Sequence, residues 1–169
     1  PHTLAVQTGQ DVEISNSDAT LHNVNAKPAT NRGFNIAQPV QGMKTKKKFT
    51  KSELGIPLKC NVHPWMKAYI HVLDHPFFAV TGADGSFAIR GLPAGTYTLE
   101  AWHETLGTQT ASVTVADGQA VELFRQIRGG ETAVLSRQRH QFGTGVKFGR
   151  AAFIFFDVGC QRCYDFSIC

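Results

Sequence analysis

The sequence contains no long apolar run. Its longest apolar stretches, such as AAFIFF at residues 151–156, fall far short of the about 20 residues that a membrane-spanning helix requires. We therefore expect no direct membrane span in this chain. The chain begins at Pro1 without an initiator methionine or an apolar leader, which predicts a processed or truncated form of a longer precursor.

Residues 1–124 also lack an excess of charge of either sign. They contain ten Lys and Arg and ten Asp and Glu residues, so the net charge of +4 comes from residues 125–169. The one local basic cluster is KTKKKFTK at residues 44–51, and no recognisable nucleic-acid module accompanies it, so we expect no nucleic-acid binding. We favour a solvated strand face for this cluster. The alternative is a docking patch for an acidic partner, formed by Lys44, Lys46, Lys47 and Lys48.

Cysteine is scarce in the body of the chain. Cys60 is the single cysteine of residues 1–124, which excludes the dense, even set of a disulfide-stabilised scaffold. The thiol of Cys60 therefore either has chemistry of its own or fills space in the core. Cys160 and Cys163 form half of a zinc or redox motif without a second pair, and they predict nothing firm.

Helical periodicity is absent before residue 124, and short alternating segments such as DVEIS, AYIHVLD and TYTLEAWH take its place. Turn signals such as TGQD, GADG and LPAG separate these segments at intervals of about eight to twelve residues, the spacing of β-sandwiches. We therefore predict an all-β fold. The longest stretch without strand character is Lys27–Thr45, where we expect a functional or covering loop.

The turn signals divide the chain into two predicted β-domains and a tail. Residues 1–74 form the first sandwich, which ends with AYIHVLD, and residues 75–124 form a second, smaller β-domain. Residues 125–169 show neither clear alternation nor helix signals, so we assign this tail no structure.

The stretch CNVHPWM, Cys60–Met66, places a thiol, an imidazole and a thioether three residues apart in one tight turn. His22 lies 38 residues before Cys60, at the edge of another predicted strand. The loops of a β-sandwich cluster at its ends, so the two segments can meet. A thiolate, two imidazoles and a weak axial thioether are the ligand set of copper in electron-transfer sites.

The motif HNV followed by CNVHPWM resembles the cupredoxins, above all amicyanin and the plastocyanins, and HTLAVQTGQDVEISNSDATLHNV is similar to the strand pair before their first histidine. The resemblance covers about residues 2–73 and implies a Greek-key β-sandwich with a type 1 copper ion. It implies that His22, Cys60 and His63 are equatorial ligands and Met66 the axial ligand. It also implies that His63 lies near the surface and passes the electron. Trp65, which is next to Met66 in the sequence, is the second residue that we place at this electron-transfer surface.

Two features depart from the cupredoxin pattern. The family usually has a strand before the one that starts at His2, so we expect an upstream segment or a partner to complete the sheet by adding a strand. The strand that leads into Cys60 is LGIPLKC, in which Pro57 restricts the hydrogen-bond ladder, so the surroundings of the thiolate can differ from those in the family.

The stretch TGADGSFAIRGLPAGTYTLEAW resembles the carboxypeptidase regulatory-like, transthyretin-like β-sandwich modules. Asp84-Gly85 and Pro93-Ala94-Gly95 supply its turns, and the alternating residues Phe87, Ile89, Tyr97 and Leu99 point into a core. The resemblance implies a rigid spacer or a docking surface and assigns no chemistry.

Several alternatives remain open. Cys60 and Met66 are core residues in a degenerate cupredoxin without metal, or the site takes zinc, or Cys60 and His63 form a catalytic pair. For Trp65 and Trp102 we favour packing over partner docking. His71, His75 and His103 could form a second metal site, although isolated histidines on strands are more often structural.

The function we predict is a copper-binding one-electron carrier rather than an enzyme, on the periplasmic or extracellular face of a membrane. Its partner is a redox protein or a membrane electron-transport complex. The alternative, from another class, is a structural or accessory subunit of a larger membrane-associated assembly with a vestigial or empty copper site.

Overall fold

The structure is a computed structural model that describes residues 1–118, 121, 125–127, 131–133, 151–155 and 166–168. The chain divides into two compact units, which meet in the sequence between Asp74 and His75. The first unit also contains a strand near the C-terminus, β14 (Phe166–Ile168), and the second contains β13 (Ala151–Phe155). Cys160 and Cys163 lie outside the described residues.

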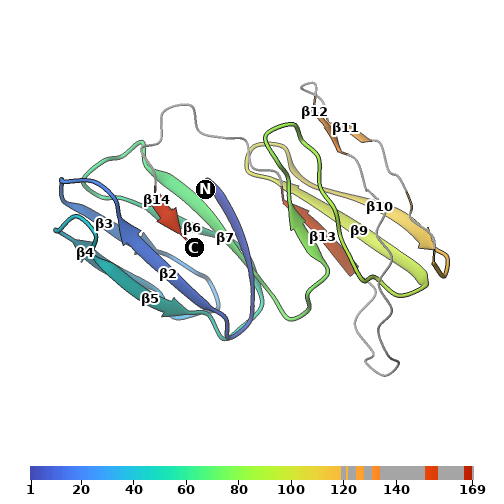
Figure 1. The fold of residues 1–169 in the computed structure, drawn as a ribbon, viewed down its shortest axis with the longest axis horizontal. Helices are drawn as coiled ribbons and strands as arrows, with labels where there is room; N and C mark the ends of the chain where they lie inside the picture. Colours follow the sequence, from blue (N-terminus) through green and yellow to red (C-terminus); the bar gives the residue numbers. More distant parts are fainter. Residues whose placement is uncertain (119–120, 122–124, 128–130, 134–150, 156–165, 169) are drawn as a thin grey trace. The chain divides into compact units, whose positions relative to one another are not determined.

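The described residues form strands and no helix, which confirms the all-β prediction (Figure 1). No helix in this part of the chain is long and apolar enough to cross a bilayer.

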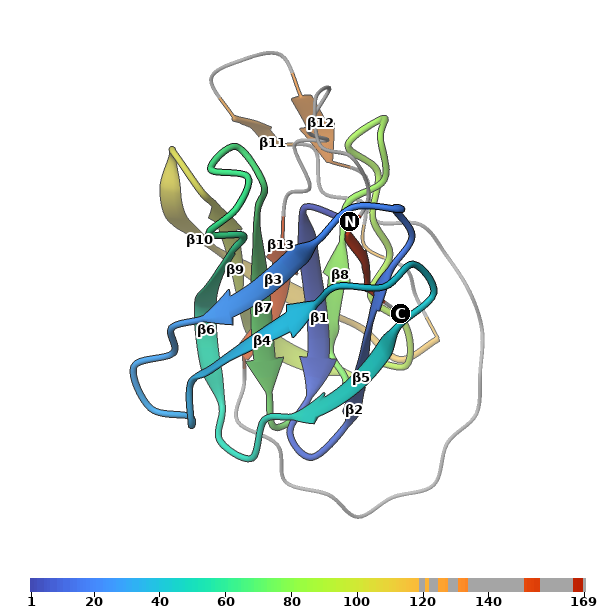
Figure 2. The same ribbon diagram turned by 90° about the vertical axis from the view of Figure 1, so that its left-hand side faces the viewer.

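The first unit contains two sheets (Figure 2). The five-stranded sheet has the order β1-β7-β6-β3-β4, and the three-stranded sheet has the order β14-β2-β5. β1 and β7 pair in parallel, and the other neighbours in both sheets are antiparallel. The strands are β1 (Thr3–Gln7), β2 (Asp11–Asn16), β3 (His22–Ala26), β4 (Phe34–Gln38), β5 (Lys44–Lys48), β6 (Glu53–Lys59) and β7 (Lys67–Leu73).

The core of the first unit lies between these two sheets. Val12 and Ile14 of β2 are buried on one side, and Ile56 of β6 and Ile70 of β7 are buried on the other. The alternation of DVEIS supplies the first pair, because every second side chain of a strand faces the same way. This packing fixes the ends of β3 and β6, where the candidate site lies.

The loop expected over Lys27–Thr45 is interrupted by β4, so that part of the prediction is wrong. β4 pairs with β3 over its whole length, from His22↔Gln38 to Ala26↔Phe34. Its alternation is only five residues long and mostly half-buried, with Phe34 and Ile36 packed against the core, so the sequence pattern is weak. Pairing with β3, rather than local propensity, makes this segment a strand.

The remaining loop before β4 is folded around the carboxylate of Glu53. The backbone N–H groups of Ala29, Thr30 and Asn31 donate to it, as do the Thr30 hydroxyl and the Asn31 side-chain amide. Burial would raise the pKa of Glu53, but these hydrogen bonds outweigh it and lower the pKa to about 2. The charged carboxylate therefore holds this loop in place.

The second unit is built on a four-stranded sheet of order β10-β9-β13-β8. β9 (Gly95–His103) and β10 (Gly107–Val115) form an antiparallel hairpin, and β13 pairs in parallel with both β9 and β8 (Phe78–Val80). Phe77, Phe87, Leu99 and Val113 form the core of this unit. Phe87 and Leu99 are thus buried as expected, and Ile89 is partly buried and packs against them, whereas Tyr97 is half-buried outside this cluster. SFAIRG forms no continuous strand.

The tail to which the sequence assigned no structure contributes four short strands. β13 lies between β8 and β9, and Phe155 in it is completely buried. β14 pairs with the end of β2 in the first unit. β11 (Arg125–Ile127) and β12 (Glu131–Ala133) pair with each other. The pairings of β13 and β14 are long-range, which explains why local patterns do not reveal them, whereas β11 and β12 pair with each other only a few residues apart.

Candidate metal centre

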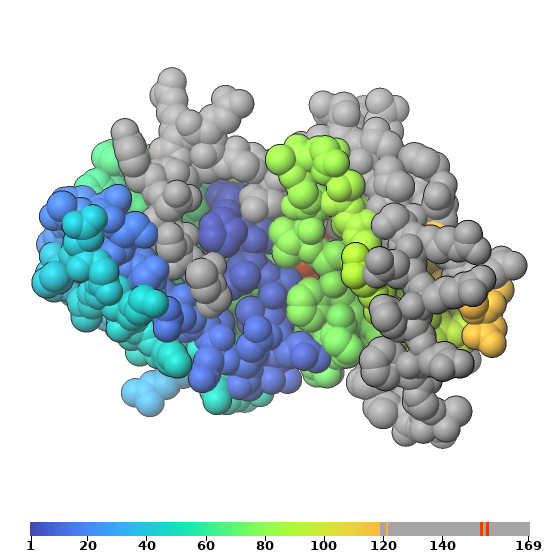
Figure 3. All heavy atoms as spheres, viewed as in Figure 1, coloured from blue at the N-terminus to red at the C-terminus, as the bar shows by residue number. Residues whose placement is uncertain are grey.

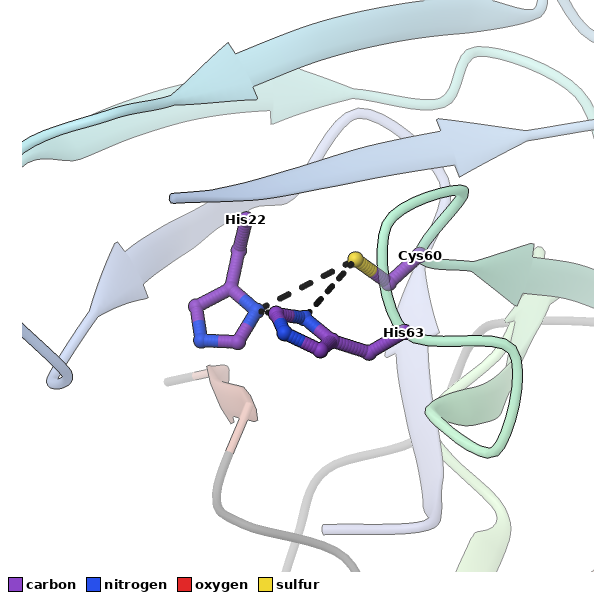
Figure 4. A group of neighbouring side chains, drawn as sticks. All are labelled: His22, Cys60 and His63. Atoms are coloured by element: carbon purple, nitrogen blue, oxygen red, sulfur yellow. Dashed lines mark hydrogen bonds between the residues drawn. The ribbon is translucent and has the colours of Figure 1, made fainter. Parts of the chain in front are cut away.

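The candidate centre lies where β3 begins and β6 ends. β3 and β6 are antiparallel neighbours that pair through Asn25↔Lys59 and Ala26↔Leu58. His22 is the first residue of β3 and Cys60 directly follows β6, so the pairing brings them to the same end of the sheet. His63 reaches the same point from the loop after Cys60 (Figure 4).

The three side chains converge through one atom each. Sγ of Cys60 lies 3.9 Å from Nδ1 of His22 and 3.7 Å from Nδ1 of His63, and the two Nδ1 atoms are 3.0 Å apart. The point equidistant from the three atoms lies about 2.1 Å from each. For zinc, bonds to imidazole nitrogen are about 2.0–2.1 Å long and bonds to thiolate sulfur about 2.3 Å. The space between the atoms therefore has the size of a first-row metal ion.

Two imidazole lone pairs at this separation repel each other unless a proton or a cation lies between them. The 3.0 Å contact between His22 and His63 is thus a polar contact that a bound cation would satisfy. Among the described residues, His22, Cys60 and His63 are the one group of His, Cys, Asp and Glu close enough to hold a metal ion.

The loop from Cys60 to Met66 is closed by its own backbone. Met66 N–H donates to the carbonyl of His63 at 2.9 Å, and Cys60 N–H donates to the carbonyl of Met66 at 3.1 Å. Met66 is buried, with 2% of its surface exposed. The loop therefore holds Met66 in the interior, with its backbone bonded to that of Cys60. The role of Met66 as the axial ligand stays a prediction.

The surroundings favour the thiolate form of Cys60. Burial alone would raise the pKa of the thiol. Hydrogen bonds from the backbone of Asn23 and from His22 and His63 outweigh burial and lower the pKa to about 6. The thiolate is the form that binds metal, so near neutral pH this cysteine is ready to act as a ligand.

The pKa of His22 is raised from its ordinary value. Burial lowers it, but hydrogen bonds to Cys60 and to Asp18 outweigh this effect. A proton on His22 competes with a metal ion for the ring nitrogen, so metal binding at this centre would release protons.

Asn23 ties the centre to its frame, and the sequence analysis missed this residue. Its Oδ1 accepts the N–H of Asn61 at 2.6 Å, and its Nδ2 donates to Oδ1 of Asn35 at 2.6 Å. Asn23 thus joins β3, β4 and the Cys60–Met66 loop. Its place directly after His22 in HNV was the available signal.

The two residues predicted for the electron-transfer surface lie side by side. Their ring centroids are 5.3 Å apart, His63 is half-buried and Trp65 is 57% exposed. The packing role that we favoured for Trp65 is therefore wrong, because a core anchor would be buried. Alternation cannot reveal this exposure, since Trp65 sits in a loop.

The basic cluster is largely paired within the chain. Lys44 forms an ion pair with Glu13 at 2.7 Å, Lys48 forms one with Asp11 at 3.2 Å, and Lys47 lies over the ring of Phe34 at 5.1 Å. The β4–β5 segment, cyan to teal, is at the surface of the first unit in Figure 3. Lys46 is exposed on the same strand. A docking role for the four lysines stays a prediction.

His71, His75 and His103, which were considered as a second metal site, each accept a hydrogen bond from the backbone. Nδ1 of the buried His71 accepts the N–H of Gly55, and burial lowers the pKa of His71 to about 3. Nδ1 of His75 accepts the N–H of Phe77, and Nδ1 of His103 accepts those of Thr105 and Leu106. Each ring therefore has a structural hydrogen bond.

Comparisons with known proteins found one family match and several similar solved structures. Residues 64–127 match the family model of the carboxypeptidase regulatory-like domain. The solved purple cupredoxin from Nitrosopumilus maritimus is similar, with 22% identity over 43% of this chain and 78% of that chain, at a TM-score of 0.37. A methionine-to-alanine variant of amicyanin in the Cu(I) state has 22% identity over 42% of this chain and 69% of that chain, also at 0.37. The search of curated proteins found no match.

The family match confirms the predicted carboxypeptidase regulatory-like domain.

Proposed function

We propose that the protein is a copper-binding one-electron carrier, in which His22, Cys60 and His63 are equatorial ligands of a type 1 copper ion and Met66 is the axial ligand. The observation that carries the proposal is the convergence of one sulfur and two imidazole nitrogens around a point about 2.1 Å from each. Copper bound in such a set accepts and releases one electron without a change of ligands.

The donor set favours copper over zinc. Structural zinc sites are tetrahedral and use thiolates, imidazoles or carboxylates, and catalytic zinc sites keep one position open. Here three ligand atoms lie together and the next donor along the loop is the thioether of the buried Met66. A soft thioether next to a Cys and two His residues is typical of copper electron-transfer centres.

The geometry disfavours a catalytic cysteine. A nucleophilic thiolate must reach a substrate, but Cys60 is 2% exposed and its sulfur faces two imidazole rings. We therefore propose electron transfer without substrate turnover.

The rigidity of the frame suits such a role. Asn23 clamps the loop after Cys60, and two backbone hydrogen bonds close the loop at Met66. Ligands that hardly move between oxidation states keep the cost of reorganisation small, so the electron transfers rapidly. Outer-shell hydrogen bonds of this kind orient metal ligands and tune the metal.

His63 is the route we propose for the electron, because it is half-buried and borders the exposed Trp65. Val62 and Leu21, which neighbour ligands in the sequence, are also large exposed hydrophobic residues, at 47% and 44%. Exposed apolar side chains suit contact with another protein. We propose that the partner is a redox protein or a membrane electron-transport complex and that the site of action is the periplasmic or extracellular face of a membrane.

The test is an absorption spectrum of the purified protein after addition of copper and mild oxidation, with the metal content measured on the same sample. We expect an intense band near ~600 nm, where thiolate-to-Cu(II) charge transfer falls in blue sites, and about one copper ion per chain. Cys60→Ser removes the sulfur and should abolish the band. A wild-type protein that takes up copper without this band would refute the proposal.

A second candidate function is a structural or accessory subunit with an empty site. It is favoured by the second unit, whose described histidines are held by structural hydrogen bonds, because a fold alone assigns no chemistry. A wild-type protein that binds no copper, while Cys60→Ser folds with the same stability, would favour this function over the carrier.

A further inference from the structure

Asp18 contacts the side of His22 that faces away from the proposed metal. Nε2 of His22 lies 2.8 Å from Oδ2 of Asp18, and the side chains are 7% and 32% exposed. The other ring nitrogen, Nδ1, points toward Cys60 and His63 (Figure 4). The imidazole is thus placed between a carboxylate and the ligand atoms.

The position of Asp18 is fixed by a buried amide. Asn16, 4% exposed, accepts the N–H of Asp18 through Oδ1 at 2.9 Å. Its Nδ2 donates to the carbonyls of Thr20 at 2.9 Å and of Gln38 at 2.8 Å. Gln38 is the residue opposite His22 in the β3–β4 pairing. The buried side chain of Asn16 therefore connects the loop that contains Asp18 to β4, the strand that pairs with β3 opposite His22.

The contact decides which nitrogen of His22 carries the proton. A carboxylate only accepts hydrogen bonds, so the neutral ring donates from Nε2 and leaves a lone pair on Nδ1. That lone pair is the one directed at Cys60 and His63. Carboxylate partners of metal-bound histidines also raise the basicity of the ligand, which favours the more highly charged state of the metal.

We propose that Asp18 is a positioning residue that holds His22 as the Nε2–H tautomer and, through its negative charge, lowers the reduction potential of the copper ion. This inference rests on the proposed function for its second part. Its first part concerns the metal-free protein and stands independently of copper.

The first test is nitrogen-15 NMR of the His22 ring in the metal-free protein at alkaline pH. We expect a protonated Nε2 and an unprotonated Nδ1 in the wild type, and a mixture of tautomers in Asp18→Ala. Asp11→Ala is the matched control, because Asp11 lies at the start of β2 and pairs with Lys48. A wild-type ring protonated on Nδ1, or the same tautomer in Asp18→Ala, would overturn the positioning role.

The second test is the reduction potential of the copper-loaded protein. Asp18→Asn keeps the size of the side chain and removes its charge. The Asn oxygen can still accept the hydrogen bond from Nε2–H, so this variant tests the charge alone, and we expect it to weaken Cu(II) binding and raise the reduction potential. Each tenfold loss that falls on Cu(II) rather than Cu(I) raises the potential by about 59 mV. Asp11→Asn, which removes the same charge elsewhere in the unit, should leave the potential nearly unchanged.

The outcomes separate the two claims. An unchanged potential in Asp18→Asn, in a protein that shows the blue band, overturns the tuning by Asp18 and leaves the proposed function standing. A wild type that binds no copper overturns the proposed function and the tuning together, while the NMR measurement still decides the tautomer. An equal rise in Asp11→Asn would assign the effect to net charge and overturn the specific role of Asp18.

Discussion

His75 and His103 of the second unit use Nδ1 in the opposite way to His22 and His63 of the first unit. In the second unit, Nδ1 of His75 and of His103 accepts a backbone N–H from two residues further along. In the first unit, Nδ1 of His22 and of His63 face each other and Cys60. A ring nitrogen engaged by its own backbone is unavailable to a metal, so the local turn, rather than the residue type, separates structural histidines from candidate ligands.

The largest expected effect comes from replacing one histidine of each kind by alanine. His63→Ala removes a proposed copper ligand and should reduce copper affinity by orders of magnitude, with loss of the blue band. His103→Ala should retain both, because its imidazole only closes a turn. Absorption spectra and metal analysis of the two variants test this. Equal loss of copper in both would contradict the distinction between structural histidines and candidate ligands.

The cores of the two units can be compared through Ile70 and Leu99. Ile70 is completely buried and Leu99 is 7% exposed. Truncation of a buried aliphatic side chain to Ala costs about 2–5 kcal/mol. We expect Ile70→Ala to lie at the upper end of this range and Leu99→Ala nearer the lower end. Chemical denaturation followed separately for each unit measures both, and a larger loss for Leu99→Ala would contradict this ranking.

Acid should act on the first unit through Glu53. Its pKa is about 2 when folded and 4.5 ordinarily, so its stabilisation is complete above pH 4.5 and is lost as the pH falls toward 2. Allowing for its partial exposure, we expect Glu53→Gln to cost about 1–2 kcal/mol at neutral pH and nothing near pH 2. Unfolding free energies of both proteins across this range test it.

Asp84 in the second unit is an exposed carboxylate with which the pH dependence of Glu53 can be compared. Its pKa is also lowered, by hydrogen bonds from the side chain and backbone of Ser86, but the group is fully exposed. Asp84→Asn should therefore show a much weaker pH dependence than Glu53→Gln. An equal dependence would mean that the enclosure of Glu53 by residues 29–31 contributes little.

The smallest expected effect concerns Met66, the proposed axial ligand, and the two methionines of the chain, Met43 and Met66, offer a matched pair. Met66→Leu preserves volume in a buried position, so its cost in stability should be below about 1.5 kcal/mol. Removing the thioether should raise the reduction potential, by about 59 mV if Cu(II) loses tenfold in relative affinity. Met43→Leu, at a 37% exposed position, should leave the potential unchanged. Equal potentials in all three proteins would exclude Met66 as a ligand.

Much of the architecture could be predicted because it depends on short-range patterns. Alternation in DVEIS reports the buried face of β2, the apolar segment AYIHVLD marks β7, which is buried over most of its length, and turn residues separate the strands. Phe87 and Leu99 were found as core residues of the second unit by the same pattern. β4 escaped because its alternation is short and half-buried, and β13 because its partners lie at least 48 residues away in the sequence.

The sequence by itself determined the donor set of the candidate centre, because the spacing of Cys60, His63 and Met66 places three ligand types in one turn. Only the tertiary structure decided which side chains surround that turn. The carboxylate of Asp18 on His22, the exposure of Trp65 and the ion pairs of Lys44 and Lys48 all depend on which strands pair and in which register. The physical reason is that a turn depends on neighbouring residues, whereas contacts between loops depend on the packing of the whole unit.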